Sequence, residues 1–166
     1  MASGKTTLGK LLAKRLGLSF VDTDHTIEER SGVSVRIIFD VEGEAAFRDR
    51  ESAVLNNLSA QAGLVVATGG GCVLRPKNRA ILNQSGLVVF LDPDLETQLK
   101  RTEGDRKRPL LQNVDRHSFL KQMKQERDPL YREVAKVVLA VDNRPGKKML
   151  EVLLRTLLEQ QWVSEE

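Results

Sequence analysis

The sequence predicts a single α/β domain over residues 1–166, built in three layers with a parallel β-sheet between two layers of helices. Three apolar runs of strand length carry this prediction: residues 64–68, 87–91 and 137–141. Nearly continuous apolar runs are typical of strands that are buried on both faces of a parallel sheet. Helical patterns separate the runs, and strands that alternate with helices favour parallel pairing. The chain is long enough to bury a substantial core.

Composition narrows the class of protein. The chain has 40% hydrophobic and 30% charged residues, as in an ordinary soluble globular protein. Its net charge of +3, from 26 basic and 23 acidic residues, does not demand a nucleic-acid partner. No stretch has the length of a transmembrane span or the apolar core of a signal peptide, and the single cysteine, Cys72, fits a reducing compartment. We therefore expect a cytoplasmic monomer that binds neither nucleic acid nor a membrane.

The first residues contain a candidate phosphate-binding loop. Gly4-Lys5-Thr6 stands at the start of a helical leucine pattern over residues 5–16. It matches the second half of the motif G-x-x-x-x-G-K-[ST], in which backbone N–H groups surround a phosphate, Lys reaches the β and γ phosphates, and the hydroxyl ligates Mg²⁺. The first glycine of the motif and the strand before it have no counterpart in the sequence. A bare Gly-Lys-Thr is common by chance, so its interpretation depends on the rest of the chain.

Two carboxylates follow the short strand predicted over residues 19–22. Ligands of open α/β sheets bind beyond the carboxyl ends of strands, so Asp22 and Asp24 could serve a metal and a substrate hydroxyl. The alternative is a helix cap, because Asp and Thr suit the first turn of the helix that follows. On this segment alone the cap is favoured. His25 is expected to be solvated, since no second metal ligand stands at a workable spacing.

Three glycines follow the predicted strand over residues 64–68. Gly69, Gly70 and Gly71 would let a ligand approach the backbone closely, and they also suit a tight turn. The two interpretations are compatible. Cys72, directly after them, is expected to pack in the interior, because no His or acid stands near it in sequence to make it a nucleophile.

A long helix is predicted over residues 33–58, with an interruption near 41–44. Residues 48–51, with the sequence Arg-Asp-Arg-Glu, crowd one turn of it. Such a charge run is usually a solvated helix face, although it could also present Arg48 to an acid.

Further helices are predicted over residues 76–85 and near the carboxyl terminus, where a leucine stripe over 150–158 spans too few heptads for a zipper and indicates core packing. Asp92 followed by Pro93 predicts another helix start, since Pro suits the first helical position and Asp the position before it.

Residues 102–115 break every periodic pattern and are rich in basic side chains. A solvated surface loop is the simplest interpretation. The functional alternative is a mobile lid that brings Arg108 over a transferring phosphate and excludes water.

Six segments taken together resemble the shikimate kinase family, in its order and at its spacing, from residue 1 to about 160. They are Gly-Lys-Thr at 4–6, Asp-Thr-Asp at 22–24, Phe-Arg-x-x-Glu at 47–51, Thr-Gly-Gly-Gly at 68–71, Arg-Pro-Leu-Leu at 108–111 and Pro-Leu-Tyr-Arg at 129–132. The resemblance implies a P-loop kinase of the nucleoside-monophosphate-kinase type, which uses Mg²⁺ and transfers the γ-phosphoryl group of ATP to the 3-hydroxyl group of shikimate. The alternatives are another small-molecule kinase of this fold, such as a gluconate kinase, and a non-catalytic remnant.

The resemblance also implies roles for individual residues. Asp24 would bind the accepting hydroxyl group as its base or orienter, and Arg108 would close onto the phosphates. With Lys5, these two residues form the expected catalytic set. The substrate pocket would consist of Asp24, Arg48, Glu51, Gly69, Gly70, Gly71 and Arg132, with Arg48 and Arg132 on the substrate carboxylate. The nucleotide site would consist of Ser3, Gly4, Lys5, Thr6, Thr7, Arg101, Arg108, Arg144 and Pro145, and Mg²⁺ would be held by Thr6 and Asp22.

One departure from the family pattern concerns the sheet. The resemblance implies five strands in the order 2-3-1-4-5, and the sequence has no counterpart of strand 1, the central one. Its absence would leave both neighbours with unpaired edges and an open core. We therefore expect this chain to be weakly stable and nearly inactive, and a strand encoded upstream of Met1 to restore both properties.

Overall fold

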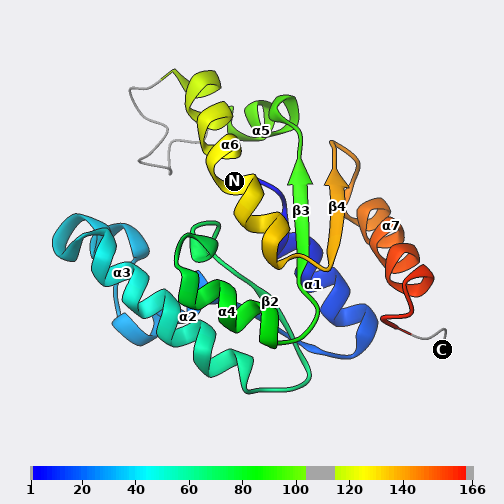
Figure 1. Cartoon of the computed structure of the whole chain (residues 1–166), viewed down its shortest axis with the longest axis horizontal. Helices are drawn as coiled ribbons and strands as arrows, with labels where there is room; N and C mark the ends of the chain where they lie inside the picture. Colours follow the sequence, from blue (N-terminus) through cyan, green and yellow to red (C-terminus); the bar gives the residue numbers. More distant parts are fainter. Residues whose placement is uncertain (1, 104–114, 164–166) are drawn as a thin grey trace.

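The computed structural model describes residues 2–103 and 115–163, so most of the predicted lid, with Arg108, lies outside the described residues. Strands and helices alternate along the chain (Figure 1), which confirms the α/β class. Its elements are α1 (Lys5–Leu16), β1 (Ser19–Asp22), α2 (Thr23–Ser31), α3 (Val35–Ser59), β2 (Leu64–Ala67), the 3₁₀ helix η1 (Cys72–Leu74), α4 (Pro76–Gln84), β3 (Val89–Pro93), α5 (Leu95–Thr102), α6 (Arg116–Val134), β4 (Val137–Val141) and α7 (Gly146–Glu159).

The strands form two separate parallel pairs. β1 pairs with β2, so that Asp22 lies opposite Ala67, and β3 pairs with β4, so that Pro93 lies opposite Val141. No ladder joins β2 to β3 in the described part of the chain. β1 and β2 thus correspond to strands 2 and 3 of the expected order, and β3 and β4 to strands 4 and 5. Between the two pairs, where strand 1 would lie, the described residues form no strand.

A cavity of about 1320 Å³ lies between the two pairs. Its walls include every residue of β2 and residues 89–91 of β3, but no residue of β1 or β4. Leucines of α1 and α7 also line it, among them Leu12 and Leu157. The inner edges of β2 and β3 therefore face an apolar space, and their backbone groups lack the neighbouring strand that a central position in a parallel sheet would supply.

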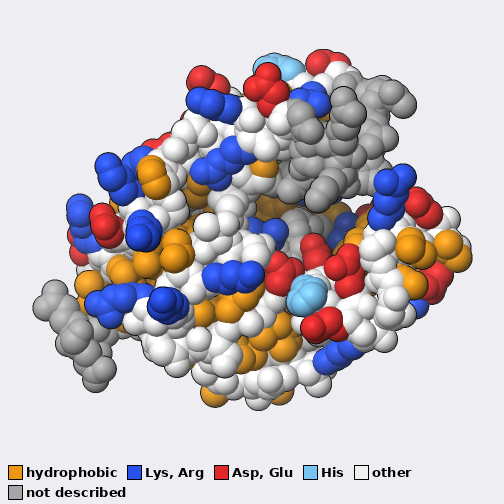
Figure 2. Space-filling view, turned by 180° about the vertical axis from the view of Figure 1, so that it is seen from behind, with side chains coloured by type: hydrophobic (Ala, Val, Ile, Leu, Met, Phe, Trp, Pro, Cys, Tyr) orange, Lys and Arg blue, Asp and Glu red, His pale blue; other side chains and the backbone are white. Residues whose placement is uncertain are grey.

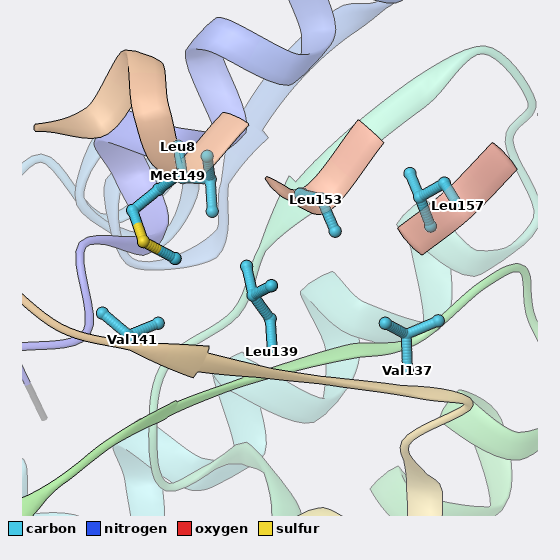
Figure 3. Packing of buried hydrophobic residues seen from close by; sticks show 7 residues of the cluster. All are labelled: Leu8, Val137, Leu139, Val141, Met149, Leu153 and Leu157. Carbon is cyan, nitrogen blue, oxygen red and sulfur yellow. The ribbon is translucent and has the colours of Figure 1, made fainter. Parts of the chain in front are cut away.

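The core beside β4 shows why these segments fold as they do. Alternate residues of β4 point to one side, as the two-residue period of a strand requires. There they meet a stripe of α7 side chains and one residue of α1 (Figure 3). The buried members are Leu8, Val137, Leu139, Val141, Met149, Leu153 and Leu157. Each contributes roughly 1.5–3 kcal/mol by leaving water. The carboxyl-terminal leucine stripe is core packing, as predicted.

The kink in α3 and the start of α5 were both predicted from the sequence, with different outcomes. The interruption predicted in the long helix is confirmed, because Gly43 leaves helical geometry with φ 85°. The helix start predicted at Asp92-Pro93 is wrong by two residues, since Pro93 ends β3. Asp94 is the cap instead, and its carboxylate accepts the N–H of Thr97 at 2.6 Å. None of the helices in the described ranges is both long and apolar enough to cross a bilayer.

Candidate active site

Three motifs that are far apart in sequence meet at the carboxyl ends of β1 and β2. The register between these strands brings both ends level, so the segments that follow them lie side by side. The Thr23 hydroxyl accepts a hydrogen bond of 3.0 Å from the N–H of Gly69. The Thr6 hydroxyl, at the start of α1, donates a hydrogen bond of 2.9 Å to Asp22. On the face of the molecule seen from behind, acidic side chains and a histidine lie at the rim of a hollow (Figure 2).

The start of α1 has the features of an anion-binding loop. Gly4 is the residue before the helix and takes a left-handed conformation with φ 83°. Its carbonyl accepts the N–H of Leu8 at 2.9 Å, which begins the helical ladder. The earlier N–H groups of the first turn have no helical partner, and the helix dipole adds partial positive charge there. Ser3 and Lys5 both line the large cavity, so the loop opens onto it.

Asp142 connects three residues that were expected in the nucleotide site, Arg101, Arg144 and Pro145. Arg101 donates hydrogen bonds to the backbone carbonyls of Ala2, at 3.1 Å, and Asp142, at 2.5 Å. Arg144 binds the Asp142 carboxylate at 2.7 Å and is exposed, like Pro145. The structure therefore brings the Arg101 and Arg144-Pro145 sides together at the start of the phosphate loop, and it also gives Arg101 a second role as a tie between that loop and the end of β4.

Thr6 and Asp22 offer a donor set that fits Mg²⁺. One Asp22 oxygen accepts the Thr6 hydroxyl, and the other accepts the N–H of Asp24 at 3.1 Å as a helix cap. The cap and the functional interpretation of Asp22 thus hold together. Within the described ranges, no group of three or more His, Cys, Asp or Glu could hold a metal. A hydroxyl and one carboxylate suffice for Mg²⁺ where phosphates and waters complete its shell.

The carboxylates of Asp24 and Glu51 both lie against Gly69. A Cβ on Gly69 would lie 2.5 Å from Glu51 Oε1 and 2.9 Å from Asp24 Oδ1, so only glycine fits there. Neither oxygen has a hydrogen-bond partner, although both are buried. Burial raises the pKa of both carboxyl groups, while Lys5 opposes the rise at Asp24 and Arg48 opposes it at Glu51. These oxygens are aimed into the site as acceptors for an incoming donor.

Arg48 is held from two sides in a fixed orientation. Its guanidinium donates to Glu51 at 2.8 Å and to Glu44 at 3.0 Å, and only 12% of its side chain is exposed. It packs so closely against Gly71 that a Cβ there would collide with the guanidinium. The charge run at residues 48–51 is therefore not a solvated face throughout, because Arg48 and Glu51 turn inward. The possibility that the helix presents Arg48 to an acid is the one that this geometry fits.

Arg132, expected on the substrate carboxylate, lies away from the cavity. Its side chain is 52% exposed, pairs with Asp92 at 2.5 Å and does not line the cavity. Arg127, which no sequence motif singled out, does line it, together with Tyr131. The two arginines are five positions apart, which places them on different faces of α6, whereas Arg127 and Tyr131 are four positions apart and share one face. The four-residue spacing between Arg127 and Tyr131 is the sequence feature that could have identified Arg127.

Two further residues lie outside the site chemistry. His25 is exposed and lies 3.3 Å from Glu29, as expected for a solvated residue. Cys72 is 1% exposed, and burial raises the pKa of its thiol to about 12. The thiol therefore stays protonated and packs as a small apolar group, as predicted.

Comparison with known proteins decides the family. A family model described as shikimate kinase matches residues 1–158. The chain belongs to the shikimate kinase family. The shikimate kinase of Pseudomonas paraeruginosa is 50% identical over 157 residues, which are 95% of this chain and 91% of that protein. This shikimate kinase family member is therefore an enzyme, a kinase of the phosphotransferase class.

Solved structures support the same assignment. The shikimate kinase of Acinetobacter baumannii in complex with shikimate has a TM-score of 0.92 at 42% identity, covering 97% of this chain and 90% of that one. The shikimate kinase of Bacteroides thetaiotaomicron has a TM-score of 0.86 at 31% identity, covering 95% and 93%. The P-loop kinase fold expected from the sequence is thus confirmed.

Proposed function

We propose that this chain transfers the γ-phosphoryl group of ATP to the 3-hydroxyl group of shikimate, giving shikimate 3-phosphate and ADP. One observation carries the proposal beyond family membership. The phosphate loop with Lys5, the unpartnered oxygen of Asp24 and the fixed guanidinium of Arg48 all line one cavity. A phosphate donor, an accepting hydroxyl group and a substrate carboxylate would each find a matching group there.

The phosphate end of the site would position the phosphates of ATP and stabilise their negative charge. The Lys5 ammonium and the N–H groups at the start of α1 would hold the phosphates of ATP. Thr6 and Asp22 would hold Mg²⁺, which when bound would offset the negative charge of the phosphates. In phosphoryl transfer, such positioning and charge stabilisation supply most of the catalysis.

Asp24 would act as the base toward the accepting hydroxyl group. As the new bond from the 3-oxygen to phosphorus forms, the bond from phosphorus to the ADP oxygen breaks and the hydroxyl proton passes to Asp24. A carboxylate whose pKa is raised by burial is a stronger base than a solvated one. Lys5 beside it favours the ionised form that the step requires.

Arg48 and Arg127 are proposed to bind the carboxylate of shikimate. An arginine fork can form two parallel hydrogen bonds with a carboxylate, which fixes the orientation of the ring as well as its charge. Arg127 replaces Arg132 in this role, because it lines the cavity and Arg132 does not. Arg108 remains assigned to the transferred phosphate by resemblance alone.

The test is a coupled assay for ADP with ATP and Mg²⁺, run in parallel with shikimate and with gluconate. We expect turnover of shikimate that depends on both ATP and Mg²⁺, and little turnover of gluconate. Equal rates with the two acceptors would indicate a broader sugar-acid kinase. Turnover of neither, even after stabilisation of the sheet as described in the Discussion, would indicate a non-catalytic protein.

A further inference from the structure

The glycine segment 69–71 is fixed at three points by three different elements. The N–H of Gly69 is bound by Thr23, the first residue of α2. The carbonyl of Gly70 accepts a hydrogen bond of 2.5 Å from Tyr131 on α6. Gly71 is packed against the guanidinium of Arg48 on α3. The backbone of this segment is therefore placed by side chains from outside it.

The bond from Thr23 lies deepest. Thr23 is only 1% exposed, Gly69 is buried, and the two residues are 46 positions apart in sequence. A buried backbone N–H group that loses its acceptor carries the full cost of desolvation. This bond therefore fixes the distance between the segment after β1 and the segment after β2.

That distance matters because Gly69 lies directly against Asp24. A Cβ on Gly69 would come within 2.9 Å of Asp24 Oδ1 and within 2.5 Å of Glu51 Oε1. Both carboxylate oxygens lack a hydrogen-bond partner, so neither of them holds the glycine in place. The hydroxyl of Thr23 is the side-chain group that binds the N–H of Gly69, while the carbonyl of Gly69 accepts the N–H of Cys72 at 3.1 Å within the turn itself.

We propose that Thr23 is a positioning residue for phosphoryl transfer, which rests on the kinase function proposed above. By holding Gly69, its hydroxyl sets the position of the Gly70 backbone relative to the Asp24 carboxylate. The accepting hydroxyl group of the substrate would be oriented between these two. Thr23 acts through Gly69 and touches neither the substrate nor the phosphates.

Two substitutions separate this role from simple packing. Thr23→Val keeps the shape of the side chain but removes the acceptor, whereas Thr23→Ser keeps the acceptor and removes a methyl group. We expect Thr23→Val to lower kcat/KM for shikimate by about 10-fold or more, the scale of misplacing a reacting group. The KM for ATP should stay within about 2-fold, and Thr23→Ser should recover most of the activity.

Thr26→Val is the matched control. Thr26 lies on the same helix, and its hydroxyl donates to the carbonyl of Asp22 at 3.1 Å, so the same substitution removes a hydroxyl from α2 without touching the glycine segment. It should leave the kinetics unchanged. Wild-type kinetics in Thr23→Val would overturn the inference, as would a Thr23→Ser enzyme as poor as Thr23→Val or an equal loss of ATP affinity.

Amide hydrogen exchange at Gly69 tests the hydrogen bond between Gly69 and Thr23 without any substrate. The Gly69 amide should exchange slowly in the wild type and in Thr23→Ser, and faster in Thr23→Val, while amides of β4 stay unchanged. If wild-type protein does not phosphorylate shikimate, the proposed function fails and the exchange measurement alone decides whether Thr23 fixes Gly69. Unchanged exchange in Thr23→Val would refute the positioning role in either case.

Discussion

The hydroxyl of Thr6 lies 2.9 Å from the carboxylate of Asp22, which joins the first turn of α1 to the end of β1. This contact brings a hydroxyl and a carboxylate oxygen to the point where the phosphates would be held. Both are hard oxygen donors of the kind Mg²⁺ prefers.

Asp22→Asn should therefore weaken the use of Mg²⁺. We expect the Mg²⁺ concentration for half-maximal activity to rise by about 10-fold, the effect of losing one ligand-shell group. The KM for shikimate should change little. A Mg²⁺ titration of kcat measures this, with Asp49→Asn as the control, because Asp49 is 74% exposed, pairs with Arg75 at 2.6 Å and does not line the cavity. An unchanged titration would remove Asp22 from the metal site.

Asp24→Asn should lower kcat by about 10²-fold, as expected for the loss of a positioned base. The pH profile provides a second check. A base must be ionised to act, so activity should rise with pH through the pKa of Asp24. Burial raises that pKa above the usual 3.8, which moves the acid limb of kcat to higher pH. The limb should disappear in Asp24→Asn, and a limb of the same shape in both enzymes would assign it to another group.

The two arginines of α6 should behave differently. Arg127→Ala is expected to raise the KM for shikimate by about 10-fold or more, since a charge-assisted contact with the carboxylate is lost. Arg132→Ala, with the same change of charge on the same helix, should stay within about 3-fold of the wild type. Steady-state kinetics decide between them. A large effect of Arg132→Ala alone would restore the original assignment from the sequence.

A strand placed ahead of Met1 should stabilise the protein, because β2 and β3 each offer a free edge to it. A strand of about 5–6 residues would form ladders on both sides at about 1 kcal/mol net per hydrogen bond, and its buried side chains would add roughly 1.5–3 kcal/mol each. Even a gain of about 5 kcal/mol would raise Tm by roughly 10–20 °C in a domain of this size.

The comparison is a valine-rich extension against a Gly-Ser extension of equal length, each measured by thermal melting and by the kinase assay. We expect only the valine-rich one to raise Tm and turnover, because it alone can fill the cavity and hold residues 2–4 in an anion-binding curl. Equal melting temperatures would show that the space between β2 and β3 does not need a strand.

Much of the fold could be predicted from local patterns. The helix over residues 5–16 and the strands at 19–22 and 137–141 lie where periodicity placed them, because their apolar faces pack in the way that local sequence reveals. β3 differs, since its ladder begins at Val89, where β4 supplies a partner, and not at the first apolar residue. Pairing between strands that are distant in sequence decides such boundaries.

The candidate site was harder to predict where a side chain's surroundings come from distant elements. Residues 48–51 look solvated in sequence, yet Gly71, 20 residues later, provides the space into which Arg48 turns. The choice between Arg127 and Arg132 depends on which face of α6 meets the cavity, and Arg132 instead pairs with Asp92 on β3. Neither relationship is present in a local spacing rule.

The buried thiol of Cys72 is a natural probe of local opening in the protein interior. It lies in a cluster with Leu55, Leu82 and Val134, which belong to three different helices. A thiol that is 1% exposed and protonated cannot react with an alkylating reagent until those helices separate. Because the chain has no other cysteine, the rate of alkylation of the native chain measures how often the helices around Cys72 open locally. Substrates that tighten the neighbouring glycine segment should lower this alkylation rate.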